Sequence, residues 1–552
     1  MVDSSAMRLL QGRLWALAAL SGVLQVLPFP IAGPVPQWRA AFCWVALVPL
    51  LWALTRDDKR GGELTAMQSG ALGYLCGFVW YLGNCYWIYQ TMYLYGGLDK
   101  PIAAGILVLF CLYLGLYHAL FGALFGAIRS YFGVQITLLL SPFLWVAVEL
   151  ARARITGLPW DLLGIAQVDN AALTRLAPIT GAYGLSFVIA LVNALWLLRI
   201  QIRERRHTRM LLTVAGVVLV VAYVIGVRKI AAPRRERATA TAILVQENLE
   251  VGAAAKGPEP SNQQLLESFS YLSRYPGTRM YMGIPEKKRT PIVTFVPKAG
   301  PSDSNLIVWP ESPAPFQEDD PEFRSAISSL ARAAGSPVIV GGIAIERTFT
   351  NARGYLLYNS AAFVTPRGDF AGRYNKMHLV PFGEYVPFKD LFFFAKNLLH
   401  EAGTFDAGGT RTLFTVNGHR YGTFICYESI FADEIRQFVR NGADVLINIS
   451  NDGWYGDTSA PWQHLNMVRM RAIENHRWVL RATNTGVTAS IDPEGRVVEA
   501  APRHTRTSIR VGFGYEHEMT FYAAHGDWFP WLCSIVTAAA LAWSLRARFA
   551  VD

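Results

Sequence analysis

Charged side chains are scarce in this sequence. Only 17% of the 552 residues are Asp, Glu, Lys or Arg, whereas 52% are hydrophobic, and an ordinary soluble domain is about 25% charged. The shortage excludes a disordered chain, which needs high charge and few apolar residues. It also excludes a purely soluble protein, because nearly all the long uncharged stretches lie before residue 230 or after residue 527.

Cysteine and internal repetition are also sparse. Six cysteines in a chain of this length are too few for a disulfide-stapled scaffold. The 29 prolines follow no repeat, which excludes a collagen-like chain. What remains is a protein with a large apolar part and an ordinary globular part.

Eight stretches are apolar enough to be transmembrane helices, each of which needs about 20 mostly apolar residues. They cover residues 9–27, 40–55, 66–90, 101–128, 130–148, 176–198, 210–227 and 528–545. The stretch 176–198 contains no charged residue at all. We therefore predict a multi-span helical membrane domain at residues 1–230, an outer domain at 231–527, and an eighth span with a short tail at 528–552.

Lysine and arginine in the short loops predict the orientation of these spans, because cytoplasmic loops are enriched in them. One side carries thirteen, namely Arg8, Arg13, Arg56, Lys59, Arg60, Arg129, Arg199, Arg203, Arg205, Arg206, Arg209, Arg546 and Arg548. The other side carries five, namely Arg39, Lys100, Arg152, Arg154 and Arg175. The asymmetry predicts that residues 231–527 lie outside the cytoplasm. The net charge of +10 then reflects membrane topology and requires no nucleic-acid partner.

The outer domain has the pattern of an α/β fold. Short β-rich runs alternate with helical segments, which is typical of sheets covered on a face by helices. We predict strands at residues 241–248, 305–312, 337–346, 355–365, 420–429, 444–452, 478–485 and 487–493, and helices at 321–335 and 461–476. Polar residues follow several of these strands, and such strand ends are where open α/β sheets place their sites. The residues that follow strands or strand-like runs are Glu311, Lys376, Cys426, Asn451 and Asp452.

Cys426 is the only cysteine of the outer domain, since the other five lie in predicted spans. A cysteine without a partner in an oxidising compartment is either a buried inert thiol or a nucleophile, and its position alone leaves both interpretations open. A nucleophile needs a base or a nearby positive charge. The histidines of the outer domain lack close ligand spacing, so we expect no metal site.

Three motifs carry a resemblance to a known family. WPES around Glu311, RYNKMHLVPFGEYVP around Lys376 and GTFICYES around Cys426 resemble the Glu-Lys-Cys triad motifs of the nitrilase superfamily. Together with eight spans, they make the whole chain similar to the apolipoprotein N-acyltransferases. The resemblance implies a multi-span α-helical membrane domain plus an extracytoplasmic α/β nitrilase-like αββα sandwich domain.

The resemblance also implies roles for individual residues. Glu311 is expected to be the general base, Lys376 the cation that stabilises the oxyanion, and Cys426 the nucleophile. The expected supporting or substrate-binding residues are Glu384, Glu428, Tyr427 and Asn359, and the backbone N–H of Tyr427 is expected to face the oxyanion. One departure is that residues 246–260 contain no tryptophan, where the family often has one.

The reaction implied by the resemblance is the last step of bacterial lipoprotein maturation. A phospholipid donates an acyl chain to Cys426, and the N-terminal amine of an S-diacylglyceryl apolipoprotein accepts it. We expect no cofactor, a monomer, and a location in the bacterial cytoplasmic (inner) membrane with the catalytic domain on the periplasmic side. The main alternative is a membrane-tethered nitrilase-type amidohydrolase that acts on a small amide.

A non-enzyme alternative is a transporter with a large binding domain, whose ionisable residues within the membrane would mark a path. The sequence offers few, with His118 the clearest and Glu149 near the end of a span.

Residues 388–399 are rich in aromatic and aliphatic side chains interleaved with Lys389 and Lys396. This composition suits a segment at the membrane surface, where apolar side chains enter the acyl region and lysines stay at the headgroups. We expect a mobile membrane-facing arm here, with an ordinary core helix as the alternative. The arm residues are Phe388, Leu391, Phe392, Phe393 and Phe394.

Overall fold

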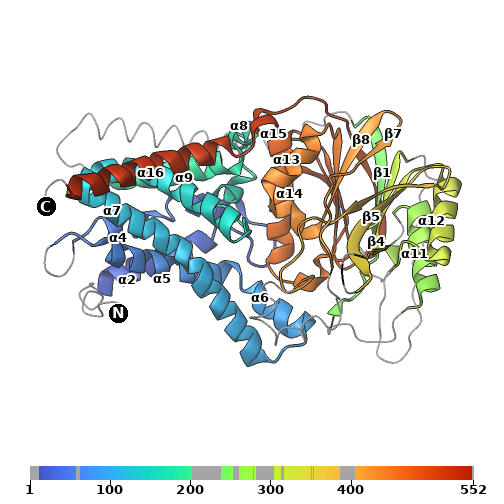
Figure 1. Ribbon diagram of the computed structural model, residues 1–552, viewed down its shortest axis with the longest axis horizontal. Coiled ribbons are helices and arrows are strands. Elements are labelled where there is room, and N and C mark those ends of the chain that lie inside the picture. Colours follow the sequence, from blue (N-terminus) through green and yellow to red (C-terminus); the bar gives the residue numbers. More distant parts are fainter. Residues whose placement is uncertain are drawn as a thin grey trace.

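A helical part and an α/β part lie side by side in the computed structural model of the chain (Figure 1). The structure describes residues 12–57, 62–201, 238–252, 260–277, 279–280, 304–311, 316–349, 351, 353–385 and 405–549. Two expectations lie outside these residues: the span at 210–227 and the arm at 388–399. Most of the segment 249–300 lies outside them as well.

The helical part contains elements at each of the other seven predicted spans. Its helices are α2 (Gly12–Val26), α3 (Gln37–Ala40), α4 (Val48–Leu54), α5 (Ala66–Asn84), α6 (Trp87–Gln90), α7 (Lys100–Ile155), α8 (Ala177–Thr180), α9 (Ala182–Gln201) and α16 (Trp528–Phe549). Among the described residues, four stretches are long and apolar enough to cross a membrane, namely Gln37–Leu54, Lys100–Ile155, Ala182–Gln201 and Trp528–Arg546. The helical membrane domain expected from the sequence is thus present.

The helix α7 covers two predicted spans. At about 1.5 Å per residue, its 56 residues exceed the roughly 30 Å of a bilayer core more than twofold. Gly133 has a positive φ of 71° inside it, so the helical geometry breaks there and divides the element into residues 100–132 and 134–155. The first half packs closely on α5: a Cβ at Gly73 would lie 2.1 Å from the His118 carbonyl oxygen. Small residues at such crossings allow helix backbones to approach in a bilayer.

The α/β part contains two sheets in the residues that the structure describes. The first has the order β2-β13-β1-β3-β4-β5-β6 and the second the order β12-β11-β10-β9-β8-β7. The strands of the first sheet are β1 (Ala240–Gln246), β2 (Arg279–Met280), β3 (Leu306–Val308), β4 (Val338–Arg347), β5 (Tyr355–Val364), β6 (Phe370–Asn375) and β13 (Arg506–Phe513). Those of the second are β7 (Leu413–Val416), β8 (His419–Ile425), β9 (Val445–Ser450), β10 (Val479–Thr483), β11 (Ala489–Ile491) and β12 (Val497–Ala500).

Helices cover the outer face of each sheet (Figure 1). The pair α11 (Asn262–Arg274) and α12 (Pro321–Ala334) covers the first sheet, and α13 (Ala432–Arg440) and α14 (Ala460–Asn475) cover the second. The core between the sheets joins Leu244 and Val308 of one sheet to Phe424 and Ile447 of the other. This αββα sandwich confirms the fold expected for the outer domain.

The predicted strands match observed ones, but five observed strands, β2, β6, β7, β12 and β13, were not among them, although the run before Lys376 in β6 was expected to be strand-like. Four of these strands, β2, β6, β7 and β12, lie at the edges of the two sheets, and every residue of β12 is exposed. In β13, the partly exposed Arg506 and the exposed Arg510 interrupt the buried residues. Edge and half-exposed strands carry a weak hydrophobic signal.

The helix α14 joins the two parts of the molecule. It lies between the second sheet and the helical part (Figure 1), and nearly all its residues are buried. Gln463 accepts a hydrogen bond from Trp160 Nε1 over 2.9 Å and donates to the Asn84 carbonyl oxygen over 3.0 Å. At the penultimate residue of α14, Glu474 Oε1 accepts from the backbone N–H of Ala182 at the start of α9 over 2.9 Å. Buried polar groups need such partners, so these contacts fix how the two parts meet.

Replacing Glu474 by Ala should destabilise the whole chain. Its carboxylate also pairs with Arg471 over 2.7 Å, with both side chains almost fully buried, so the substitution leaves a buried guanidinium unpaired. Breaking such a pair costs about 3 kcal/mol or more, which thermal unfolding of the detergent-solubilised protein would detect. Glu494→Ala is the control, because Glu494 is half exposed beside Arg496 and exposed pairs contribute at most about 1 kcal/mol. Equal losses of stability in Glu474→Ala and Glu494→Ala would contradict the conclusion that the buried contacts of Glu474 hold the two parts of the molecule together.

Candidate active site

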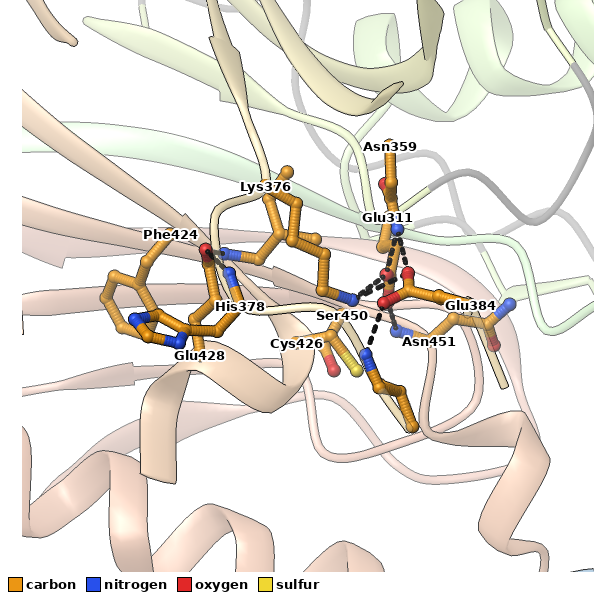
Figure 2. A network of polar contacts seen from close by, with 12 residues as sticks. Glu311, Asn359, Lys376, His378, Glu384, Phe424, Cys426, Glu428, Ser450 and Asn451 are labelled. Carbon is orange, nitrogen blue, oxygen red and sulfur yellow. Dashed lines mark hydrogen bonds and ion pairs between the residues drawn. The ribbon is translucent and has the colours of Figure 1, made fainter. Parts of the chain in front are cut away.

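The polar residues that follow strands come together at one edge of the sandwich (Figure 2). Glu311 follows β3 and Lys376 follows β6 in the first sheet, while Cys426 follows β8 and Asn451 follows β9 in the second. β8 and β9 are parallel neighbours, so their carboxyl ends share an edge. Asn359, on β5, pairs with Ile343 of β4 and reaches the same place.

A buried lysine lies at the centre of this cluster. Lys376 Nζ lies 3.1 Å from Glu311 Oε1 and 2.9 Å from Glu384 Oε1, and its side chain is only 1% exposed. Asn359 Nδ2 donates to the same two carboxylate oxygens over 2.7 Å each. The lysine and the amide thus hold two carboxylates that would otherwise repel each other (Figure 2).

Both remaining carboxylate oxygens accept backbone N–H groups. Glu311 Oε2 accepts from Asn451 over 2.8 Å, and Glu384 Oε2 accepts from Val380 over 2.8 Å. The first of these bonds links a residue of the first sheet to the end of β9 in the second. The position of Glu311 is therefore fixed by both sheets.

The lysine is a permanent cation. Burial alone would lower the pKa of Lys376, but the Glu311 and Glu384 carboxylates outweigh it and raise that pKa well above its usual value. A group with so high a pKa cannot act as a base near neutral pH. It can stabilise negative charge that develops beside it, which is the role expected of it from the sequence.

Cys426 is a buried thiol in an unusual backbone conformation. It is 6% exposed and has a φ of +50°, in the left-handed region that residues with a Cβ seldom adopt. Burial raises the pKa of the thiol, the Glu311 carboxylate raises it further, and Lys376 opposes them. The thiol therefore holds its proton at neutral pH and needs a base to become a nucleophile.

Glu428 joins two segments of the site by hydrogen bonds. Among the contacts of the described residues, none is a hydrogen bond or ion pair between Glu428 and Lys376 Nζ. Its carboxylate accepts from Tyr374 Oη and from the backbone N–H groups of Met377 and Ile425, each over 2.7 Å. It therefore ties the segment that carries Lys376 to the turn that carries Cys426. Burial raises the pKa of Glu428, against the hydrogen bonds that lower it.

The side chain of Tyr427 turns away from the cluster toward the helical part. Its hydroxyl donates to the Gly157 carbonyl oxygen over 3.2 Å. Glu311, Lys376, Glu384 and Asn359 thus meet in one network beside Cys426, with Glu428 and Tyr427 holding the turn at Cys426 from outside it. No cluster of three or more His, Cys, Asp and Glu side chains suited to a metal ion occurs in the described part of the chain.

Sequence reasoning missed the second group of residues around Cys426. His464, on α14, contacts the Cys426 carbonyl oxygen, and its partners are Asp452 and Ser429. Asp452 was visible as a polar residue after a strand. His464 gave no signal, because it lies 38 residues from Cys426 in the chain and no local motif joins them.

Comparisons with known proteins cover both parts of the chain. Residues 21–195 match the family model described as apolipoprotein N-acyltransferase N-terminal domain, and residues 277–511 match carbon-nitrogen hydrolase. The chain is similar to the apolipoprotein N-acyltransferase of Geobacter metallireducens, with 35% identity over 97% of this chain and 96% of that one. The enzyme of the same name from Methylococcus capsulatus is 34% identical, over 93% and 92%. That from Vibrio parahaemolyticus is 31% identical, over 96% and 97%.

The raised pKa of the Cys426 thiol predicts slow alkylation at neutral pH. Below the thiol pKa, the rate should rise about tenfold per pH unit as the thiolate fraction grows. We expect iodoacetamide labelling of Cys426, followed by peptide mass spectrometry, to rise without a plateau between pH 7 and pH 10. Lys376→Met should slow it further, because the variant removes the charge that lowers the pKa. A plateau near pH 7 would show that the resting enzyme already holds a thiolate.

Proposed function

This chain belongs to the apolipoprotein N-acyltransferase family of the nitrilase superfamily, and from that membership we propose how it acylates lipoproteins. The acyl chain of a phospholipid moves first to Cys426 as a thioester and then to the N-terminal amine of an S-diacylglyceryl apolipoprotein. The observation that supports this most is the single network of Glu311, Lys376, Glu384 and Asn359 beside a buried thiol.

In the first half-reaction, Glu311 takes the Cys426 proton and the thiolate attacks the ester carbonyl carbon of the lipid. An ammonium has three N–H donors, and Glu311 and Glu384 take two of those of Lys376. The third is assigned to the tetrahedral oxyanion, together with the Tyr427 backbone N–H. The carbon–oxygen bond then breaks. Glu311 gives the proton it took from Cys426 to the leaving oxygen, and the lysophospholipid departs as an alcohol.

In the second half-reaction, the free α-amine of the apolipoprotein attacks the thioester carbonyl. Glu311 accepts the amine proton, the carbon–sulfur bond breaks, and an amide forms. Cys426 regains a proton from Glu311, which restores the starting state. Splitting one transfer into two steps through a covalent intermediate lowers the barrier of each, and neither step involves a metal or an organic cofactor.

Glu384 and Asn359 are assigned to holding the lysine. Glu384 supplies the second carboxylate that keeps the Lys376 pKa high, and Asn359 bridges the two carboxylates. Glu428 and Tyr427 are assigned to the turn at Cys426 by the contacts described above. These four side chains would then shape the site, while the proton and the acyl chain move on Glu311 and Cys426.

We infer the membrane orientation from the charges of the loops and from the packing of the two parts. Arg154, one of the five basic residues predicted to face outward, lies 3.1 Å from Asp433 of the α/β part. Arg129, one of the thirteen predicted to face inward, pairs with Asp57 over 3.0 Å. The helix α16 runs from the α/β part to the opposite end of the helical part (Figure 1). These contacts support a catalytic domain on the periplasmic side of the bacterial inner membrane.

The triad assignment predicts distinct effects of three substitutions on thioester formation with a labelled phospholipid, detected by mass spectrometry. Cys426→Ala should abolish the adduct. Glu311→Gln should slow its formation by about 10²-fold or more through loss of the base. Lys376→Ala should slow it by about 10²–10³-fold through loss of oxyanion stabilisation. Cys533→Ala and Glu322→Gln are matched controls outside the site.

An adduct on another cysteine, or undiminished turnover of Cys426→Ala, would contradict this mechanism. Release of free fatty acid or ammonia instead of acyl transfer to a lipopeptide would favour the amidohydrolase alternative.

The predicted orientation is tested by reporter fusions. Alkaline phosphatase is active only outside the cytoplasm, so a fusion after residue 300 should be active and one after residue 205 inactive. The same positions fused to green fluorescent protein should give the opposite pattern. The reverse result for both reporters would place the catalytic domain in the cytoplasm.

A further inference from the structure

A second buried polar chain ends on the backbone of Cys426. Arg481 Nη2 donates to Asp452 Oδ2 over 2.6 Å, and His464 Nδ1 lies 2.9 Å from Asp452 Oδ1. His464 Nε2 lies 3.1 Å from the Cys426 carbonyl oxygen and 2.6 Å from Ser429 Oγ. The side chains of Arg481, Asp452 and His464 have no exposed surface. These polar residues belong to the second sheet and its following turns and to α14. Their contacts are separate from the network around Lys376.

The groups around the imidazole define what each of its nitrogens can do. A carboxylate oxygen only accepts hydrogen bonds, so a bond to Asp452 Oδ1 uses an N–H at Nδ1. A carbonyl oxygen also only accepts, so a bond to Cys426 uses an N–H at Nε2. Ser429 Oγ, 2.6 Å from the same Nε2, is a hydroxyl that can donate or accept. The role inferred below is that of the Nε2 N–H toward the Cys426 carbonyl.

The bond to the Cys426 carbonyl has a geometric consequence. The carbonyl of Cys426 and the N–H of Tyr427 belong to one planar peptide group, in which they point in opposite directions. A contact that fixes the direction of the Cys426 carbonyl therefore also fixes the direction of the Tyr427 N–H. The left-handed φ of Cys426 persists only where its surroundings hold it, and the His464 bond is a direct contact to the peptide that follows.

The ring is itself immobilised from two further sides. Trp160 of the helical part stacks on it at a centroid distance of 6.0 Å and an interplanar angle of 26°. Tyr455 meets it edge-on at 6.2 Å. A ring with aromatic contacts from two residues and hydrogen-bond partners at both nitrogens has little rotational freedom. Such a ring can fix the orientation of the peptide group that it contacts.

We propose that His464 is a positioning residue for the acyl transfer. By donating to the Cys426 carbonyl, it fixes the peptide plane whose N–H, that of Tyr427, binds the oxyanion opposite Lys376. The inference rests on the proposed function, because the N–H has this role only if an oxyanion forms at Cys426. It gives the Arg481-Asp452-His464 chain a task in the transition state rather than in substrate binding.

Two amide variants separate this role from a purely structural one. In His464→Gln the amide nitrogen takes the place of Nε2 and still reaches the Cys426 carbonyl, whereas in His464→Asn it takes the place of Nδ1 and does not. The rate of thioester formation from labelled phospholipid should fall by less than about fivefold in the Gln variant. It should fall on the order of 10²-fold in the Asn variant, as expected when a reacting group is misplaced.

Two other readouts locate the defect. The KM for phospholipid should stay within about twofold in both variants, because the bond acts on the transition state. Alkylation of Cys426 by iodoacetamide forms no oxyanion, so its rate should change by less than about fivefold in both. His517→Asn is the control, since His517 also places Nδ1 2.9 Å from an aspartate, Asp444, but its side chain is 69% exposed.

Equal rates of thioester formation in the two amide variants would overturn the proposal. So would loss of folded protein in both, which would assign the chain to folding alone. A wild-type enzyme that forms no thioester would instead contradict the proposed function and, with it, this inference. A normal wild-type thioester with indistinguishable variants contradicts the role of His464 only.

Discussion

The buried ammonium of Lys376 is the interaction on which the rest of the site depends. A lone charge with 1% of its side chain exposed would be strongly unfavourable, and two carboxylates at hydrogen-bonding distance make it stable. Those carboxylates repel each other and in turn need Lys376 and Asn359 between them. Removing Lys376 would leave two buried carboxylates without a cation, and removing either carboxylate would leave Lys376 with a single ion-pair partner. The strand ends of the first sheet and the turn that carries Glu384 must therefore fold together before the site exists.

This cluster carries more negative than positive charge, and it lies next to a buried thiol. Glu311 raises the pKa of Cys426 and is also the group assigned to remove its proton. The same carboxylate thus keeps the thiolate rare in the resting enzyme and accepts the proton when the thiol reacts. Because Glu311 is held by Asn451 of the second sheet as well as by Lys376, its position relative to the thiol is set by the sandwich as a whole.

The helix α14 connects the chemistry to the membrane part. Gln463 and Glu474 bond to the helical part, while His464 bonds to the turn at Cys426. A helix that is buried on nearly every side can carry polar residues only where each finds a partner, and here those partners belong to both parts of the molecule. The interface between the membrane helices and the α/β sandwich therefore includes Gln463, the residue next to the one that contacts the Cys426 carbonyl.

The sequence by itself determined the features that depend on local composition and short motifs. Uncharged runs predicted the membrane helices, apolar strands predicted most of the sandwich, and three motifs predicted that Glu311, Lys376 and Cys426 act together. Strands with a weak apolar signal, such as the exposed β12 and the arginine-interrupted β13, were not predicted, because their pairing in the sheets supplies what their local sequence pattern does not show. Only the tertiary structure decided that Asn451 holds Glu311 and that His464 holds Cys426. Those contacts join residues 140 and 38 positions apart, and the burial that makes them strong exists only after both sheets and α14 have packed.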